Sequence, residues 1–307
     1  MPPTTSPRIL THTDMDGVCC AALFLRKYGT DLDVTYASVK QAGDLDKSGS
    51  SFDFVCDLPK VGNAINLDHH KSNHDNLVAK NRLSSDDIID SNSPSATEIV
   101  YSHLNLEGDP IASEIRKLGN LADTAQLPSR FRPLDMVLSM YADAPKILRE
   151  ISVLLAQKGD NILLSPWLKQ KVSEIRDSFD QTNRIIEKFL MKTPKLAPIL
   201  ILDTRNVIPG KLAKEVIKPI FDLGVAVLAV IYHKSSEEPI RTSLRVTKSK
   251  QQDYDVSLTA MAFGGGGHRM AAACSPDEID IPKNLKNELQ KIALPGDTIQ
   301  YLRLTDV

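Results

Sequence analysis

The chain has 307 residues, of which 42% are hydrophobic and 25% are charged, and its formal net charge at pH 7 is −2. This length is sufficient for two domains with separate cores, and the near-balance of charge argues against a protein that holds long DNA or RNA mainly through its phosphates. No aliphatic run approaches the roughly 20 residues of a membrane-spanning helix, and residues 1–5 lack the features of a signal peptide. Four cysteines without a CxxC pair indicate reduced thiols. We therefore expect a cytoplasmic protein that does not enter a membrane.

The first third of the chain alternates between short apolar strands and helical segments. A helix is expected over 18–28, where Gly29 ends it, and strands are expected over 8–11, 32–37, 52–56 and 64–67. Strands separated by helical segments are typical of an α/β layer with a mostly parallel sheet.

From Ser93 onward the pattern becomes helical. Ser93 precedes a proline, and residues 95–98 have the form of a capping box, so a helix should begin there. Further helices are expected over 111–125, 132–141 and 144–157. A long charged helix over 168–191 is expected to link two bodies.

The α/β pattern returns after this linker. Helices are expected over 211–223 and 286–292, and strands over 199–203, 225–232, 240–246 and 298–304. We therefore divide the chain into a first domain over 1–165, a helical linker over 166–195 and a second domain over 196–307.

Three side chains that can bind metals follow the first expected strand. Side chains alternate along an extended segment, so His12, Asp14 and Asp16 should project to one side, and Gly17 permits the turn into the helix. The alternative is an aspartate that caps the helix, with incidental neighbours. Ligands bind at the carboxyl ends of strands in open α/β sheets, and this position favours the metal interpretation.

Further groups of the same kind are expected at that edge. Asp57 ends the third strand, the triplet Asp68-His69-His70 ends the fourth, and Asp123 lies in an otherwise apolar helical stretch, where an unpaired carboxylate is costly. The triplet alone would also suit a surface loop with two ordinary histidines. Together, these carboxylates are too many to bury without cations. Oxygen ligands with one or two imidazoles favour Mn²⁺ or Mg²⁺, in a site sufficient for two ions that share a carboxylate.

The motifs of this region resemble, in order, the four motifs of the DHH phosphoesterase superfamily. They are His12-x-Asp14-x-Asp16-Gly17, then Asp57, then Asp68-His69-His70, then Asp123. The resemblance covers most of residues 8–125. We assign the second motif to Asp57, because Asp53 lies inside the apolar strand.

The resemblance implies a role for each of these side chains. One Mn²⁺ or Mg²⁺ ion would be held by His12, Asp14 and Asp57. A second ion would be held by Asp16, Asp57, His69 and Asp123, with Asp57 as the bridge between the two ions. The catalytic group would comprise His70, which faces the substrate phosphate, Asp68, which orients the histidines, and Asp57.

The second domain resembles the DHHA1 domain of the same superfamily. A glycine run at 264–267 precedes His268, and Arg245 lies in a strand before it. Glycines let backbone N–H groups approach a phosphate, and His268 and Arg245 can add charge-assisted hydrogen bonds. The resemblance implies that substrate is bound by Arg245, Gly265, Gly266, Gly267 and His268. Four glycines leave open which of them takes each place, and a lone glycine run is more often a flexible loop.

These observations predict an α/β fold with a mostly parallel N-terminal sheet that has helices on both faces, a helical linker and a smaller C-terminal α/β domain with a mixed sheet. The expected function is that of a two-metal phosphodiesterase of the oligoribonuclease type. It would hydrolyse short single-stranded oligonucleotides, preferably RNA, with two Mn²⁺ ions as cofactors or Mg²⁺ in their place. The alternatives are a cyclic-dinucleotide phosphodiesterase, a nucleoside-bisphosphate phosphatase and a non-catalytic RNA-binding module. The oligomeric state stays open, and a homodimer is one of the alternatives.

Overall fold

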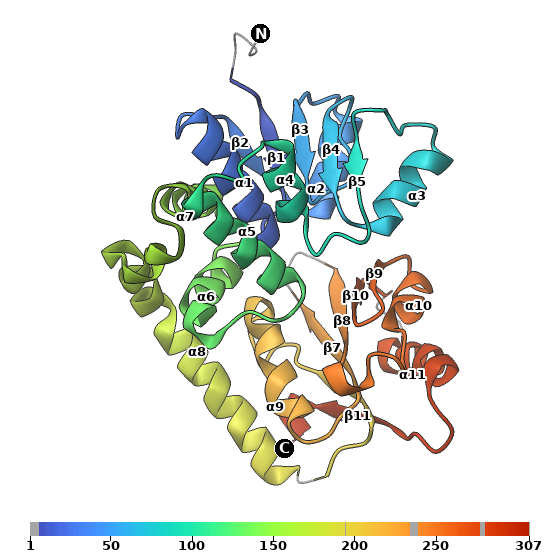
Figure 1. Cartoon of the computed structure of the whole chain (residues 1–307). Helices are drawn as coiled ribbons and strands as arrows, with labels where there is room; N and C mark the ends of the chain where they lie inside the picture. The colour runs from blue at the N-terminus through green and yellow to red at the C-terminus, as the bar shows by residue number, and fades with distance from the viewer. Residues whose placement is uncertain (1–5, 194, 234–238, 277–279, 307) are drawn as a thin grey trace. The chain divides into compact units, whose positions relative to one another are not determined.

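The computed structural model describes residues 6–193, 195–233, 239–276 and 280–306. The chain divides into two compact units, Met1–Ile175 and Arg176–Val307, and the boundary falls inside helix α8 (Pro166–Lys192) (Figure 1). The expected long helix is therefore present. The division into two domains and a separate linker stays a prediction, because the two units meet within this helix. Within the described part of the chain, no helix is both long enough and apolar enough to cross a bilayer.

The first unit is built on a five-stranded sheet in which every pairing is parallel, with strand order β2-β1-β3-β4-β5. The strands are β1 (Ile9–Thr11), β2 (Val34–Tyr36), β3 (Phe54–Cys56), β4 (Ile65–Asp68) and β5 (Ile88–Ile89). All three residues of β1 are buried, as is typical of an interior strand of a parallel sheet. The predicted parallel sheet is confirmed. Strand β5 was not predicted, because two residues are too few to show a periodicity.

Seven α-helices lie wholly within the described part of the first unit, in the blue to green part of Figure 1. They are α1 (Met15–Tyr28), α2 (Val39–Lys47), α3 (Lys71–Ala79), α4 (Ala96–His103), α5 (Pro110–Asp123), α6 (Arg132–Met140) and α7 (Pro145–Lys158). Helix α1 is buried from Met15 to Leu25, because α4, α5 and α7 all pack against it. Helix α2 covers Leu10 and Val55 of the sheet through Ala42.

Helix α4 begins two residues later than the proline suggested. Ser95 is its N-cap and accepts a hydrogen bond from Glu98 N at 3.2 Å. The predicted cap at Ser93 is wrong, because the Ser93 hydroxyl donates instead to Ser95 O at 2.9 Å. Ser95 thereby fixes the start of α4, whose first turn contacts the candidate metal centre described below.

The second unit contains a six-stranded sheet with strand order β11-β6-β7-β8-β10-β9. The strands are β6 (Ile199–Asp203), β7 (Val227–His233), β8 (Ile240–Val246), β9 (Gly266–His268), β10 (Ala271–Cys274) and β11 (Ile299–Arg303). Strand β6 pairs in parallel with β7 and β11, whereas β7–β8, β8–β10 and β10–β9 are antiparallel. The predicted mixed sheet is confirmed.

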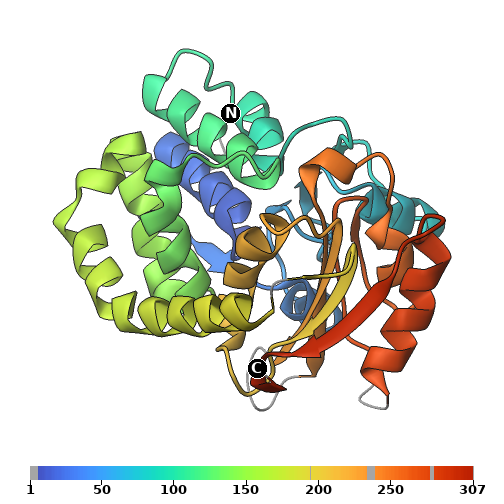
Figure 2. The same ribbon diagram turned by 90° about the horizontal axis from the view of Figure 1, so that it is seen from below.

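Besides the C-terminal part of α8, the described residues of the second unit form the α-helices α9 (Ile217–Phe221), α10 (Val256–Met261) and α11 (Ile281–Ile292). Helix α11 packs on the sheet through Ile281, Leu285 and Leu289, which share one face at a spacing of four residues. Figure 2 shows α11 beside the sheet in red. The single helix expected over 211–223 is wrong: residues Gly210–Val216 form a 3₁₀ helix, and α9 begins only at Ile217. Pro219 explains the difference, because proline is tolerated only in the first turn of an α-helix.

Candidate metal centre

The loop after β1 carries His12 and Asp14 to the carboxyl end of the sheet. Gly17 is required there, because a Cβ on this residue would lie 2.4 Å from His12 O. Asp14 caps α1 by accepting a hydrogen bond from Gly17 N at 3.0 Å, and its other oxygen lies 2.8 Å from His12 Nδ1. The two interpretations of this loop are therefore compatible, since Asp14 caps the helix with one oxygen and faces His12 with the other.

Asp57 lies at the centre of the cluster. It is buried, and its backbone is left-handed, with a φ of 55°, which is uncommon for a residue other than glycine. Its Oδ2 lies 3.3 Å from His12 Nδ1, and its Oδ1 lies 3.8 Å from His69 Nε2 and 3.6 Å from His70 Nδ1. Asp57 Oδ2 has no well-aligned hydrogen-bond donor among the described residues. The two oxygens thus face different sides of the cluster, as a bridging carboxylate requires.

Asn66, which the sequence analysis did not single out, holds the turn that carries Asp57. This buried residue of β4 donates from Nδ2 to Val55 O at 3.1 Å and to Leu58 O at 3.0 Å. The two carbonyls lie on either side of Asp57, so one amide group fixes both ends of the turn. The sequence did contain a signal for this role, namely an asparagine in the middle of an otherwise apolar strand.

Asp16 is buried and is bound by the first turn of α4. Its Oδ2 accepts from Ala96 N at 2.8 Å, and its Oδ1 accepts from Thr97 N at 2.9 Å and from the Thr97 hydroxyl. Gly119 of α5 packs closely behind, since a Cβ there would lie 2.4 Å from Thr97 Oγ1. A carboxylate has about four acceptor positions. Asp16 can therefore offer an ion only one oxygen, Oδ2, which lies 4.0 Å from His69 Nε2.

His69 and Asp123 complete a second group of ligands. His69 is buried, and its Nε2 lies 3.3 Å from Asp123 Oδ2. Asp123 is the last residue of α5, and its side chain is 29% exposed, so the expected cost of burying it inside an apolar helix was wrong. Potential ligand atoms lie within 4.8 Å of one another in each of two triplets: Asp16, His69 and Asp123, and His12, Asp14 and Asp57.

Asp68 and His70 lie beside these triplets. Asp68 is fully buried, and its Oδ1 accepts from His69 N, His70 N and His70 Nδ1 at 2.7, 3.1 and 2.8 Å. Asn73 Nδ2 donates to its second oxygen. Because these donors occupy Asp68, it suits the orientation of the histidines better than the binding of an ion. The His70 side chain is 30% exposed.

The carboxylates of the cluster oppose one another's ionisation. Burial and the charges of Asp14 and Asp16 raise the pKa of Asp57 well above its ordinary value. Partial burial and the same two charges raise the pKa of Asp123 to about 7. Burial lowers the pKa of His12, but Asp14 and Asp57 outweigh this effect and hold it above its ordinary value. Such a cluster lacks positive charge, and divalent cations would supply it.

The residues expected to bind substrate lie together in the second unit. Arg245 of β8 is paired in register with Ala271 of β10, which is paired with His268 of β9. Residues opposite one another in antiparallel strands share a face, so Arg245 and His268 flank the small side chain of Ala271. Arg245 Nη1 donates to Leu244 O at 2.9 Å, and burial lowers its pKa.

Two of the four glycines are required by the packing of β9 on β10. A Cβ on Gly265 would lie 2.2 Å from Ala273 O, and a Cβ on Gly267 would lie 2.6 Å from Ala271 O. A Cβ on Gly266 would meet no atom within 4 Å. The second half of the glycine run, Gly266 and Gly267, therefore belongs to the edge strand β9, and of these three glycines only Gly266 has room for a side chain.

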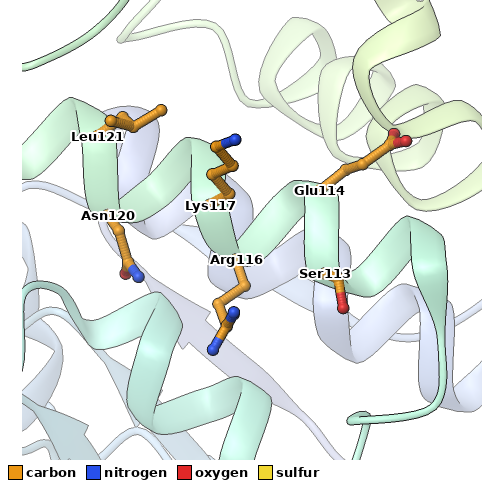
Figure 3. Close-up of a pocket in the computed structure, with 6 residues that line it drawn as sticks. All are labelled: Ser113, Glu114, Arg116, Lys117, Asn120 and Leu121. Atoms are coloured by element: carbon orange, nitrogen blue, oxygen red, sulfur yellow. The ribbon is translucent and has the colours of Figure 1, made fainter.

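A hollow of about 390 Å³ lies along α5, apart from the metal ligands (Figure 3). It is lined by Ser113, Glu114, Arg116, Lys117, Asn120 and Leu121. Glu98 accepts from Arg116 at 3.1 Å and from Asn120, and Asn120 accepts from Ser95 at 2.6 Å. These bonds join α5 to the start of α4 and give the hollow a structural role.

Comparisons with known proteins extend these observations. No protein-family model and no curated protein matches the chain. Among solved structures, the pGpG-specific phosphodiesterase PggH from Vibrio cholerae matches with a TM-score of 0.62 at 18% identity, over 94% of this chain and 99% of that one. RecJ from Thermus thermophilus in complex with Mn²⁺ matches with a TM-score of 0.52 at 15% identity, over 96% of this chain and 53% of RecJ, so the chain spans about half of RecJ. Both likenesses show a shared fold, and the predicted α/β fold with one parallel and one mixed sheet is confirmed.

Proposed function

We propose that this chain, which has the fold of the DHH superfamily, is a metal-dependent phosphodiesterase that hydrolyses short single-stranded oligonucleotides, preferably RNA. The observation that carries the proposal is the convergence of two ligand triplets on the buried Asp57. Four separate segments of the chain supply these side chains, and their carboxylates raise one another's pKa. A binding module has no need of such a cluster.

The side chains suit two divalent ions. His12, Asp14 and Asp57 would hold one ion, and Asp16, His69 and Asp123 the other, with Asp57 shared between them. Bound ions of this kind activate a water molecule and neutralise the scissile phosphate. Oxygen ligands with imidazoles favour Mn²⁺, with Mg²⁺ as the alternative, and the RecJ structures contain these ions.

His70 and Asp68 would act on the substrate rather than on the ions. The hydrogen bond from His70 Nδ1 to Asp68 fixes the orientation of the ring and directs Nε2 away from Asp68. Burial lowers the pKa of His70, but Asp68 outweighs this effect and holds it above its ordinary value. A protonated His70 would donate a hydrogen bond from Nε2 to a phosphate oxygen and stabilise the charge that develops on it.

Arg245 and His268 would hold another phosphate of the substrate. They share one face of the second sheet with only Ala271 between them, which leaves room for a phosphate group. A net charge of −2 suits short substrates better than long ones. PggH, which matches this chain along nearly its whole length, acts on the dinucleotide pGpG, and this favours substrates of about that length.

A product time course would test the proposal. Labelled RNA and DNA of two to five nucleotides, a cyclic dinucleotide and a nucleoside bisphosphate should be compared, each with Mn²⁺, with Mg²⁺ and with excess chelator. We expect mononucleotides from the short RNAs only when a metal is present. Turnover of the cyclic dinucleotide alone would replace this proposal by that of a cyclic-dinucleotide phosphodiesterase, and full hydrolysis in chelator would refute the metal mechanism.

The role of the second unit can be tested separately. Arg245→Gln and His268→Gln should each weaken cleavage of dinucleotides about ten- to a hundredfold, because each removes a charge-assisted hydrogen bond. Both variants should keep their metal and most of their hydrolysis of bis-p-nitrophenyl phosphate, which lacks a second phosphate for these residues to hold. An equal loss of activity on both substrates would contradict the proposal that Arg245 and His268 bind a second phosphate of the substrate.

A further inference from the structure

The second unit contains a cavity at the carboxyl end of its parallel strands. The cavity has a volume of about 310 Å³, and it is lined by Asp203, Arg205, Asn206, His233, Arg303 and Thr305. Strands β6, β7 and β11 end at Asp203, His233 and Arg303. These strands are mutually parallel, so their carboxyl ends meet at one edge, where open α/β sheets bind ligands.

This cavity is distinct from the face that carries Arg245 and His268. Arg245 is paired with Leu228 near the beginning of β7, whereas His233 is the last residue of that strand. Five residues of extended chain separate the two positions, which is a distance of roughly 16 Å. The cavity therefore needs an explanation of its own.

The lining of the cavity carries more positive than negative charge. The buried Asp203 accepts from Arg205 Nε at 2.9 Å and from Arg205 Nη2 at 2.6 Å, and it also accepts from Tyr301 Oη at 3.1 Å. Asp203 is thereby neutralised and fixes the Arg205 guanidinium. Arg303 adds a second guanidinium, whose Nε donates to Tyr301 Oη at 2.9 Å and whose side chain is 54% exposed.

Several donors around the cavity are not used within the unit. His233 Nδ1 is buried and has no hydrogen-bond partner among the described residues, which is costly for a polar atom. Within the same part of the chain, the terminal nitrogens of Arg303 make no hydrogen bond, and neither does the side-chain amide of Asn206. Asn206 is held in a left-handed conformation with a φ of 63°. An anion in the cavity could accept hydrogen bonds from Arg303 and Asn206 together.

We propose that this cavity binds a small molecule through a phosphate group. Two guanidinium groups, an imidazole and an amide line it, which suits the several oxygens of a phosphate better than the two oxygens of a carboxylate. Its volume lies at the lower end of the range for small-molecule sites, so it admits a free phosphate or a mononucleotide but no polymer. This inference does not depend on the hydrolysis proposed above.

Calorimetry on the full chain would test the proposal, with inorganic phosphate and a nucleoside 5′-monophosphate as the two probes. Excess chelator should be present, so that no ion in the metal centre can bind either probe. Two variants remove donors: Arg303→Gln removes an exposed guanidinium, and Asn206→Gly removes the amide while permitting the left-handed backbone. Lys218→Gln is the matched control, because Lys218 lies in the same unit, is 82% exposed and is paired with Asp222.

We expect both probes to bind the natural chain and the Lys218→Gln control alike. Arg303→Gln should weaken binding about ten- to a hundredfold, and Asn206→Gly should weaken it by about threefold to tenfold. Equal affinities for the two probes would show that the phosphate alone is recognised, and tighter binding of the nucleotide would show that the nucleoside also enters the cavity. The proposal is overturned if the natural chain binds neither probe, or if both variants bind as tightly as the control.

Discussion

Replacing Asn66 by leucine should weaken metal binding beyond what the loss of stability alone explains. Leucine has nearly the same size as asparagine but lacks the Nδ2 group that donates to Val55 O and Leu58 O. Two hydrogen bonds of roughly 1 kcal/mol each are lost. In compensation, Asn66 Oδ1, a buried atom without a hydrogen-bond partner in the described part of the chain, is removed as well. Because a buried carbonyl oxygen left without its donor costs about 1–3 kcal/mol, the net loss in the free energy of unfolding is about 1–3 kcal/mol.

The substitution should also change the position of Asp57. A non-glycine residue in the left-handed region carries a strain of about 1–3 kcal/mol, and the surrounding structure must maintain it. Asn66 is the side chain that ties together both ends of this turn. Without it, the backbone can relax and carry the carboxylate away from His12 and His69. Loss of a group that orients metal ligands typically lowers affinity about ten- to a hundredfold.

Urea denaturation and calorimetric Mn²⁺ titration, performed on the same preparations, would measure the two effects. Ile151→Val is a suitable control, because Ile151 is fully buried in α7 and the substitution costs about 0.5–1.5 kcal/mol. The control should lose stability and keep its affinity for Mn²⁺, whereas Asn66→Leu should lose affinity. If Asn66→Leu binds Mn²⁺ as the control does, the turn does not need its asparagine and the reasoning is refuted.

Four further predictions concern the same sites. Removal of divalent ions by chelation should abolish hydrolysis, and Mn²⁺ should restore it at least as well as Mg²⁺ in a product assay; activity that persists without metal would contradict this. Burial and neighbouring carboxylates raise the pKa of Asp57, and they raise the pKa of Asp123 to about 7. The folded metal-free chain therefore binds more protons than the unfolded chain between roughly pH 4 and 7. Its free energy of unfolding should therefore fall as the pH rises through this window, and Mn²⁺ should reduce the fall; a rise in urea titrations would show the opposite sign. Asp57→Asn should abolish turnover and reduce the amount of bound metal, whereas Asp53→Asn should do neither. If metal analysis shows that Asp53→Asn loses metal and Asp57→Asn keeps it, the assignment of the second motif to Asp57 is wrong. Gly267→Ala should lower the thermal midpoint, because its Cβ would lie 2.6 Å from a carbonyl oxygen, and Gly266→Ala should leave it unchanged; equal midpoints would mean that β9 adapts.

The sequence predicted those parts of the site that follow directly from strand ends. His12, Asp57 and His69 each come just after or at the end of a strand of one parallel sheet, and such ends must meet at one edge. Their grouping was therefore predictable without knowledge of the packing. The metal roles assigned to them stay predictions, because they rest on the geometry of ligands alone.

The contacts that orient the ligands could not be predicted in the same way. Asp16 is bound by Ala96, 80 residues further along the chain, and no local pattern indicates such a contact. Asp123 was selected for an apolar setting that it does not have, since it ends its helix with a partly exposed side chain. Strand β9 was hidden because glycine has a low strand propensity, and only the close approach of β10 explains it.

The hydrogen bonds from the first turn of α4 to Asp16 affect when a newly made chain could bind divalent ions. Asp16 leaves the ribosome long before Ala96, and Asp123 follows later still, so the second ligand triplet cannot form until all three segments have been synthesised and folded. Ions that bind only the finished unit stabilise it by mass action, by about 2.7 kcal/mol when their concentration is 100 times the dissociation constant. Copies made under metal scarcity would keep a repulsive cluster of carboxylates and unfold more often. If the chain binds divalent ions as proposed, their supply in a cell would also influence how long each copy escapes proteolysis.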